Sequence, residues 1–147
     1  MTLTPNILAM YLGCRVHLFD RIEQTTGRLA AVKTNGNCEL ALPSRFNPEC
    51  EVISIYRIDE VKPILRRLED MTEEEAIEIF VLEGWGNNLQ NIVVTDKAIE
   101  HNTFGATGIQ TFKRLRAETF AHLLSKGFDL FGLCDSGLAI DSKTIKP

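Results

Sequence analysis

The dipeptide Asn35-Gly36 is the feature that most constrains how this chain can fold. The tightest hairpin turns need positive φ at both central positions, and asparagine followed by glycine meets this need at the lowest cost. Alternate apolar residues follow the dipeptide at Cys38, Leu40 and Leu42. We therefore predict a β-hairpin here, with the stretch after Gly36 returning as a strand.

Alternation with a period of two continues outside this hairpin. Polar Arg15 and His17 alternate with apolar residues, which predicts a strand over Arg15–Phe19 with one buried face. β-Branched residues favour a further strand over 51–56. We interpret residues 14–57 as a small antiparallel β meander or an SH3-like barrel.

Helix boundaries are marked at three places. Thr4 followed by Pro5 is typical of a helix N-terminus, with threonine as the cap and proline in the first turn. Thr72 and Glu75 have the spacing of a capping box, which predicts a second helix start. Gly84 can adopt the left-handed conformation that ends this helix.

The second half of the chain mixes helix and strand signals. Pro63 lies within residues 58–71 and disfavours a regular helix, so we expect an extended connector there. Short β-branched and glycine-rich stretches predict weak strands over 92–111, and an apolar stripe predicts a helix over 112–126. The expected fold class is α+β, with a β-rich lobe, a connector and a helix-containing α+β lobe, or one continuous domain. These parts are residues 1–57, 58–71 and 72–147.

Composition narrows the class of protein. Hydrophobic residues make up 44% and charged residues 24%, as in folded globular chains. The net charge of -4 argues against nucleic acid as a partner, because phosphate binding depends on clustered lysine and arginine. The chain has neither a signal-peptide pattern nor a run of ~20 apolar residues. We expect a cytoplasmic protein without a membrane partner.

Reactive side chains do not form a pattern that supports catalysis. The four cysteines include no Cys-x-x-Cys pair and the three histidines lack metal-ligand spacing, so we expect buried thiols, no metal and no cofactor. Asp135-Ser136-Gly137 lacks the first glycine of a nucleophile elbow. Gly105–Gly108 is too short for a phosphate-cradling loop. We predict no catalytic residue, and binding is favoured over enzymatic activity.

A ligand-binding set can nonetheless be proposed. The only tryptophan lies between two glycines and precedes two asparagines, an aromatic platform with amides that suits a planar ligand. Three cations near a helix start can contact phosphate, and one histidine in a polar stretch is a candidate general base. The set is Trp85, Asn87, Asn88, His101, Lys113, Arg114 and Arg116.

Each member of this set also has a structural interpretation. Gly84 can cap the helix while Trp85 fills the space between the lobes. The three cations can form a solvated helix face, and His101 can be a solvated strand residue. The sequence leaves both interpretations open.

Three segments carry a resemblance to a known group. They are Tyr11-Leu12-Gly13-Cys14, Pro63-Ile64-Leu65-Arg66 with Leu68 and the run from Asp70 to Glu75, and residues 123–133 followed by 137–141. In these segments the chain resembles small uncharacterised proteins encoded by phages and prophages of gut Bacteroidetes. Those proteins tend to carry a second proline at the position of Arg67, a departure that weakens the match in the connector. The resemblance implies a phage or prophage origin and no defined activity.

These patterns lead to one main hypothesis and two alternatives. The main hypothesis is a non-enzymatic phage-type accessory protein that binds a host or phage protein, with a homo-oligomer left open. The alternatives are a sponge for a nucleotide-like signalling ligand, as a counter-measure to host defence, and a nucleic-acid-associated small barrel. A sponge requires a pocket where an aromatic ring and cations converge, whereas a protein binder requires an exposed apolar patch.

Overall fold

The computed structural model contains both helices and strands, which confirms the α+β class. It describes residues 2–18, 25–44, 46–47 and 49–145. Contacts divide the chain into two units: unit 1 is residues 1–65 with 131–147, and unit 2 is residues 66–130.

Strands dominate unit 1, and unit 2 combines two helices with a small sheet. The elements of unit 1 are α1 (Pro5–Ala9), β1 (Arg15–Leu18), β2 (Thr25–Val32), β3 (Asn37–Pro43), β4 (Glu51–Arg57), η1 (Ile58–Glu60), β5 (Val61–Leu65), β9 (Ile140–Asp141) and η3 (Ser142–Thr144). The elements of unit 2 are η2 (Leu68–Asp70), α2 (Glu73–Leu82), β6 (Val93–Val94), β7 (Ala98–Thr103), β8 (Ala106–Thr111) and α3 (Ala117–Ser125).

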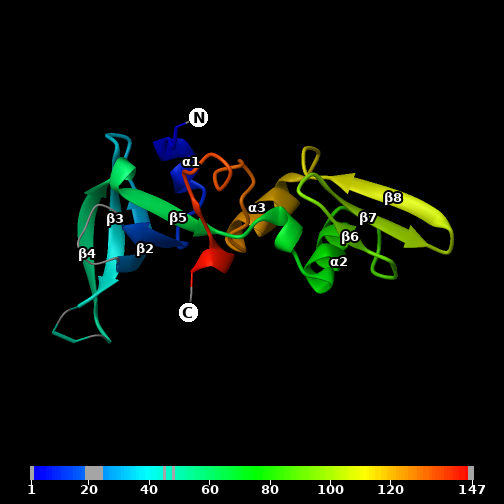
Figure 1. Ribbon diagram of the computed structural model, residues 1–147, viewed down its shortest axis with the longest axis horizontal. Helices are drawn as coiled ribbons and strands as arrows, with labels where there is room; N and C mark the ends of the chain where they lie inside the picture. The colour runs from blue at the N-terminus through cyan, green and yellow to red at the C-terminus, as the bar shows by residue number, and fades with distance from the viewer. Residues whose placement is uncertain (1, 19–24, 45, 48, 146–147) are drawn as a thin grey trace. The chain divides into compact units, whose positions relative to one another are not determined.

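The strands of unit 1 form one sheet in the order β4-β3-β2-β1-β5-β9 (Figure 1). Consecutive strands from β1 to β4 pair antiparallel, so the predicted meander is confirmed. In the described part of the chain β4 and β9 are edge strands, so the sheet is not closed into a barrel. Phe19, the predicted end of the first strand, lies outside the described residues.

The hairpin predicted at Asn35-Gly36 is present as β2–β3, but its turn differs from the one expected. Gly36 has a φ of +89°, whereas Asn35 is absent from the described residues that have positive φ. The Lys33 N–H donates to the Asn37 carbonyl (2.9 Å). The Asn35 side-chain oxygen accepts from the Asn37 N–H (3.1 Å). This is a three-residue loop in which only the last residue is left-handed.

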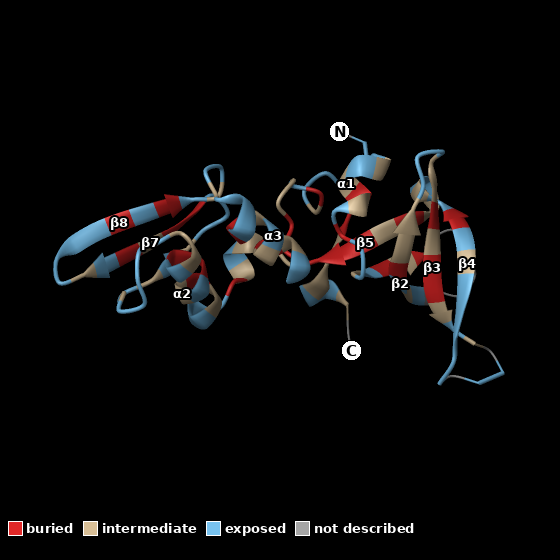
Figure 2. Ribbon diagram, turned by 180° about the vertical axis from the view of Figure 1, so that it is seen from behind, coloured by how far each residue is buried: buried red, intermediate tan, exposed pale blue. Residues whose placement is uncertain are grey.

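The core of unit 1 gathers side chains from α1 and from alternate positions of the sheet (Figure 2). The helix starts as predicted, because the Thr4 hydroxyl accepts from the Ile7 N–H (3.2 Å) and Pro5 occupies the first turn. The buried residues that pack together are Leu8, Val16, Leu18, Leu29, Cys38, Leu40, Tyr56 and Val61.

The expected connector, residues 58–71, contains a strand of the unit 1 sheet. β5 pairs antiparallel with β1, with Val16 opposite Pro63, and parallel with β9 at Ile64 and Leu65. Proline lacks an N–H and therefore argues against a central strand. For this reason β5 was not predicted from the sequence. The structure accommodates Pro63 because β9 reaches only Ile64, so β5 is paired on one side at the proline.

Residues 131–147 lie with unit 1, whereas the sequence-based division placed them with residues 72–147. The expected last strand, 138–140, corresponds to β9, which pairs with β5. A two-residue strand that pairs in parallel across a long stretch of chain leaves no local pattern that identifies its partner. Unit 2 is thus an insertion in the sequence between β5 and the C-terminal part of unit 1.

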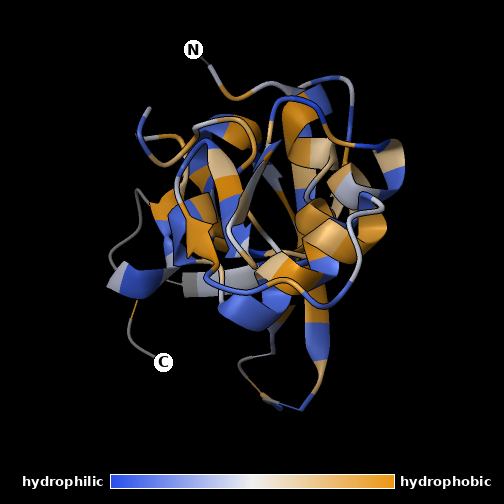
Figure 3. Ribbon diagram, turned by 90° about the vertical axis from the view of Figure 1, so that its right-hand side faces the viewer, coloured by the Kyte–Doolittle hydropathy of each residue, from blue (hydrophilic) through white to orange (hydrophobic). Residues whose placement is uncertain are grey.

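Unit 2 packs its helices against the sheet β6-β7-β8. The predicted capping box is confirmed: Thr72 Oγ1 accepts from the Glu75 N–H (3.2 Å), and Glu75 Oε1 accepts from the Thr72 N–H (3.0 Å). Hydrophobic and hydrophilic residues alternate along the ribbon, as elements with one buried face require (Figure 3). The buried residues of this core are Met71, Ala76, Ile79, Phe80, Ile99, Leu123 and Phe128.

Arg66 holds the beginning of unit 2 to α2. Its guanidinium donates to both Glu75 carboxylate oxygens, at 2.7 and 2.6 Å. It also lies 4.3 Å from the centroid of the Phe128 ring, within the range of a cation–π contact. The hydrogen bonds from Arg66 lower the pKa of Glu75 to about 2.

The cysteines differ in burial. Cys38 is buried, Cys14 and Cys134 are half-buried, and Cys50 is exposed, so the expectation of buried thiols fails for Cys50. Burial raises the pKa of the Cys14 thiol to about 12. Burial, with a smaller contribution from Glu60, raises the pKa of Cys38 to about 11. These two thiols are therefore neutral at physiological pH.

Candidate functional site

Trp85 is placed by the way α2 ends. Gly84 has a φ of +88°, its N–H donates to the Val81 carbonyl (3.1 Å), and the Trp85 N–H donates to the Phe80 carbonyl (2.8 Å). This pair of bonds is a Schellman motif, in which the residue after the glycine packs against the last helical turn. The rings of Trp85 and Phe80 make that contact, edge to face with centroids 5.7 Å apart.

His101 completes an aromatic cluster, defined here as Phe80, Trp85 and His101. The His101 ring meets Phe80 edge to face at 5.3 Å and Trp85 at 5.5 Å between centroids. Trp85 is 42% exposed, whereas His101 is 7% exposed. The cluster therefore combines the partly exposed indole of Trp85 with the buried imidazole of His101.

Two residues of β8, Gln110 and Gly108, contact this cluster. The Trp85 indole N–H donates to Gln110 Oε1 (2.9 Å), and the Gln110 amide donates to the Arg114 carbonyl (3.0 Å). Gly108 lies opposite His101 in the β7–β8 ladder, and a side chain at Gly108 would overlap both the imidazole and the indole. The two rings thus fill the space that a glycine leaves open.

The two ring nitrogens of His101 differ in their surroundings. Thr103 Oγ1 accepts from the Gln90 N–H (2.9 Å) and lies 3.0 Å from His101 Nδ1. Thr103 Oγ1 can either donate to Nδ1 or accept from it, because a hydroxyl has one hydrogen and two lone pairs. Nε2 is buried and has no hydrogen-bond partner in the described part of the chain. His101 is a buried member of the cluster, so it is not the solvated strand residue of the structural interpretation.

The three predicted cations lie in the turn before α3 and at its N-cap. Lys113 and Arg114 are exposed in the turn before α3, and the Arg114 carbonyl accepts from Gln110. The Arg116 guanidinium lies closer to the cluster, because Nη2 is 3.4 Å from the position that a Cβ at Gly84 would occupy. Of the three, Arg116 is the cation that the structure brings beside Trp85.

Glu83 connects the two helices, a role that the sequence analysis did not predict. Its carboxylate accepts from the Arg116 N–H (3.0 Å) and from the Thr119 hydroxyl (2.5 Å), and so caps α3. α3 begins at Ala117 rather than at 112, because the chain before it forms a turn. The one signal was the lack of a serine, threonine, asparagine or aspartate at the N-cap, where Arg116 stands.

Asn87 and Asn88 are both exposed in the loop after α2. They follow Gly86, whose φ of +102° turns the chain after Trp85. The structure thus brings Trp85 and His101 into contact and places the Arg116 guanidinium beside Gly84. It leaves Asn87 and Asn88 on the surface of the adjoining loop.

The β7–β8 hairpin carries a feature that sequence reasoning missed. Phe104 is 92% exposed and has a φ of +53°, and Gly105 follows with a φ of +81°. Both values fit the two-residue turn in which asparagine or aspartate normally takes the first position. The signal was present as Phe104-Gly105 between polar β-forming residues, where the phenylalanine resembles a core residue rather than a turn residue.

Two further apolar side chains lie on the outer face of the same sheet. Val93 and Ile109 pair with Glu100 from opposite sides, so all three share one face. Val93 is 56% exposed and Ile109 is 52% exposed. Together with Phe104 these residues make up the hairpin patch.

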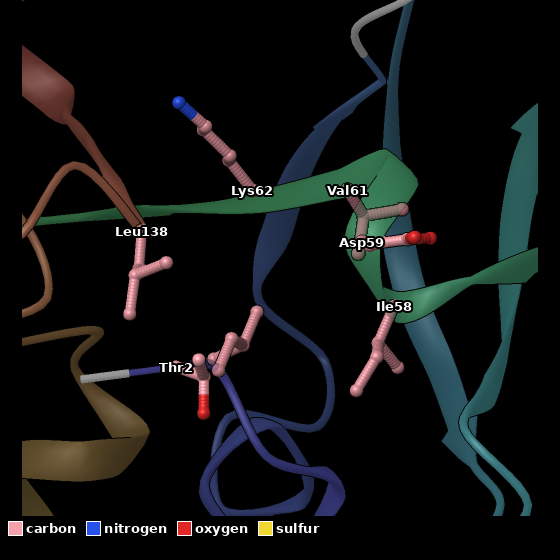
Figure 4. A pocket seen from close by; sticks show the side chains of 7 residues that line it. Thr2, Ile58, Asp59, Val61, Lys62 and Leu138 are labelled. Atoms are coloured by element: carbon pink, nitrogen blue, oxygen red, sulfur yellow. The ribbon is translucent and has the colours of Figure 1, made fainter.

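A pocket of about 230 Å³ lies in unit 1. Figure 4 shows apolar side chains around it, including Ile58 and Leu138, while the Lys62 ammonium points away from its centre. The lining residues are Thr2, Leu3, Ile58, Asp59, Val61, Lys62 and Leu138. An aromatic platform with converging cations, as a nucleotide requires, is not part of this lining.

No group of three or more histidine, cysteine, aspartate or glutamate side chains that could hold a metal ion occurs among the described residues. Within the same residues, no helix has the length and apolar character needed to cross a membrane. Comparison of the chain with protein families, curated proteins and solved structures gives no match.

Proposed function

We propose that this protein is a non-enzymatic binding protein that holds a partner protein at the tip of the β7–β8 hairpin. The observation that carries the proposal is Phe104, an aromatic side chain 92% exposed at a φ of +53°. A non-glycine residue in this conformation costs on the order of 1–2 kcal/mol. Insertion of the ring into a partner's pocket would bury a large apolar surface and offset this cost.

The hairpin patch supports the same use of this region. Val93 and Ile109 add exposed apolar surface on the outer face of the same sheet, and the polar pair Asn102 and Thr107 lies between them and the tip. Glu100 lies between them and provides a charge that can select among partners. An aromatic anchor beside aliphatic contacts with one charge is a common composition for a protein-binding surface.

The partner is proposed to be a host or phage protein. This part of the proposal rests on the resemblance to phage and prophage proteins of gut Bacteroidetes, and it makes the chain an accessory protein acting in the cytoplasm of the host cell. Interference with a host protein is the activity that such a context suggests.

The test is a capture experiment in which only the anchor changes. Phe104→Asn places the residue that this turn prefers at the tip, so the hairpin is preserved while the ring is removed. Phe46→Asn is the matched control, because Phe46 is 99% exposed in unit 1. We expect the wild-type chain and Phe46→Asn to retain the same protein from a Bacteroidetes host lysate, and Phe104→Asn to lose it. Equal retention by Phe104→Asn would end the proposal.

One observation favours the nucleotide-binding alternative. Trp85 is 42% exposed, and the Arg116 guanidinium lies beside Gly84, so a base could stack on the indole while the cation contacts phosphate. A thermal-shift screen with mono-, di- and cyclic nucleotides tests this. The alternative requires a nucleotide that raises the Tm of the wild-type chain and does so less for Arg116→Gln. It is abandoned if none raises the wild-type Tm.

A further inference from the structure

The outer edge of the unit 1 sheet is a second apolar surface, separate from the hairpin patch. β4 forms this edge and pairs with β3 along its whole length, from Glu51 to Arg57. Val52, Ile53 and Ile55 are 48%, 53% and 61% exposed. Figure 2 shows β4 mostly in the colour of exposed residues beside the buried positions of β3. Soluble proteins normally protect such an edge with lysine, proline or a bulge, and β4 has none of these.

The backbone groups of β4 that point away from β3 belong to its odd-numbered residues. Even-numbered residues next to β4 make the ladder bonds with β3, since the Ile58 N–H donates to Gly36 (3.0 Å) and Cys50 accepts from Ser44 (2.8 Å). Antiparallel pairing alternates, so Ile53 and Ile55 direct their N–H and C=O groups away from β3. The Arg57 N–H agrees, because it donates to the Glu60 carboxylate and not to β3 (3.1 Å).

The sequence of β4 is complementary to itself when read in the opposite direction. In Glu51-Val52-Ile53-Ser54-Ile55-Tyr56-Arg57, an antiparallel pairing centred on Ser54 places Glu51 opposite Arg57 and Ile53 opposite Ile55 of a second strand. Ile53 and Ile55 share the outer face, so four isoleucines would meet there. We propose that β4 pairs antiparallel with β4 of a second copy of this chain, with a twofold axis at Ser54.

The charges at the two ends fix this register. Glu51 binds Arg28 (2.9 Å) and Arg57 binds Asp59 (3.2 Å), but each of these side chains keeps half or more of its surface exposed. Each remains available to an opposite charge across the interface. A shift of one residue in the pairing would turn the isoleucines of one copy away from those of the other.

Sedimentation analysis of the full chain is the first test. We expect a species of twice the mass of one chain, in equilibrium with monomer. Ile55→Lys places two lysines in the interface and weakens association at least about tenfold. Val81→Lys is the control, since Val81 is 49% exposed on α2 in unit 2. A wild-type chain that stays monomeric at its highest soluble concentration overturns the proposal, and so does equal weakening by both variants.

A crosslink tests the register itself. In the proposed pairing the two Ser54 residues form a non-hydrogen-bonded pair with Cα atoms about 4.5 Å apart, within the range of a disulfide. The two Val52 residues are offset by four residues, about 13 Å. In a Cys50→Ser background, Ser54→Cys should form disulfide-linked dimers under mild oxidation and Val52→Cys should not. Equal crosslinking at both positions, or none at Ser54→Cys, contradicts this register.

Exchanging the charges at the two ends of β4 distinguishes the proposed β4–β4 pairing from nonspecific association. Glu51→Arg and Arg57→Glu should each self-associate more weakly than wild type, because like charges then face each other. Mixing these two variants should restore a heterodimer, in which every end pair is again oppositely charged. A mixture that stays monomeric counts against the proposal. This outcome is independent of the hairpin patch, which lies in unit 2.

Discussion

The β2–β3 hairpin of unit 1 and the β7–β8 hairpin of unit 2 close in different ways. The β2–β3 hairpin of unit 1 has an asparagine before its glycine, yet only Gly36 is left-handed. The β7–β8 hairpin of unit 2 has a phenylalanine before its glycine, and both Phe104 and Gly105 are left-handed. Asparagine tolerates positive φ better than phenylalanine does, yet Asn35 does not adopt it and Phe104 does.

This contrast shows where the chain departs from local preference. In unit 1 the Asn35 side chain bonds to the Asn37 N–H, so turn chemistry and fold agree. In unit 2 the tip keeps an aromatic ring that strains the backbone and stays 92% exposed. Departures from consistency between levels are expected at functional sites, which is why the tip of unit 2 is the better candidate.

The largest expected loss of stability comes from replacing a glycine in the strands of each hairpin, Gly27 in β2 and Gly108 in β8. A methyl group at Gly108 would overlap the His101 and Trp85 rings, whereas one at Gly27 would mainly meet the end of the Leu42 side chain. Rings packed on both sides cannot move aside as a leucine methyl can. We expect Gly108→Ala to lower the free energy of unfolding by about 2–3 kcal/mol and Gly27→Ala by about 1 kcal/mol.

Urea unfolding measures both glycine variants. Trp85 is the only tryptophan, so its fluorescence reports on unit 2, and circular dichroism follows the whole chain. Equal losses for the two variants would mean that the aromatic cluster yields as readily as a leucine side chain. The close packing of His101 against Gly108 would then be an incorrect description.

The second largest effect is expected at the ion pair between Arg66 and Glu75 in unit 2, and it depends on pH. Glu75→Gln keeps an acceptor for the capping box but removes the ion pair with Arg66. The folded pKa of Glu75 is about 2, below its ordinary value of 4.5, so the stabilisation is complete above pH 4.5 and is lost as the pH falls toward 2. At pH 7 we expect the variant to be about 1–2 kcal/mol less stable, by urea unfolding followed through Trp85.

Glu74→Gln is the control for this comparison. Glu74 lies in the same first turn of α2 and is exposed, so its replacement removes only a contribution to the helix dipole, about 0.5 kcal/mol. The difference between wild type and Glu75→Gln should shrink below pH 4.5, because Glu75 of the unfolded wild-type chain then takes up a proton that the folded chain binds only near pH 2. A difference that stays constant down to pH 2 would assign the loss to something other than the ion pair.

Local features of the fold could be predicted, and long-range ones could not. The caps at Thr4 and Thr72 depend on residues within one turn, so their spacing in the sequence was sufficient. The pairing of β5 with β9 joins segments that are far apart in the chain, and Pro63 disguises the strand. Local pattern carries no information on such partners.

The same distinction between local features and long-range contacts applies to the candidate site. Gly84 as a helix end was predicted, whereas the contacts of Trp85 with Phe80 and His101 were not. His101 was expected in solvent or as a base, but its surroundings depend on Gly108 lying opposite it in the ladder. Glu83 caps α3 from the other helix, a contact that no spacing within either helix encodes. Phe104 was overlooked because an aromatic residue before glycine does not resemble a turn.

A smaller effect is expected at the tip of unit 2. Phe104→Asn relieves a left-handed conformation that costs a phenylalanine more than an asparagine. Because Phe104 is 92% exposed, little packing is lost. We expect the free energy of unfolding to rise by about 1 kcal/mol, measured by urea unfolding with Trp85 fluorescence. A loss of stability would show that the ring packs within unit 2, and the proposed anchor would lose its basis.

The smallest effect is expected at the turn of unit 1. Asn35→Ala removes the side-chain acceptor of the Asn37 N–H but requires no change in φ, because Asn35 is not left-handed. We expect a loss of about 0.5 kcal/mol, measured by circular dichroism in urea. Asn35→Gly is the matched variant: a turn that needed positive φ at this position would be more stable with glycine than with alanine, by about 1 kcal/mol. If glycine were that much better, the turn would be the mirror-image type after all, and the two hairpins would differ only in the residue that bears the strain.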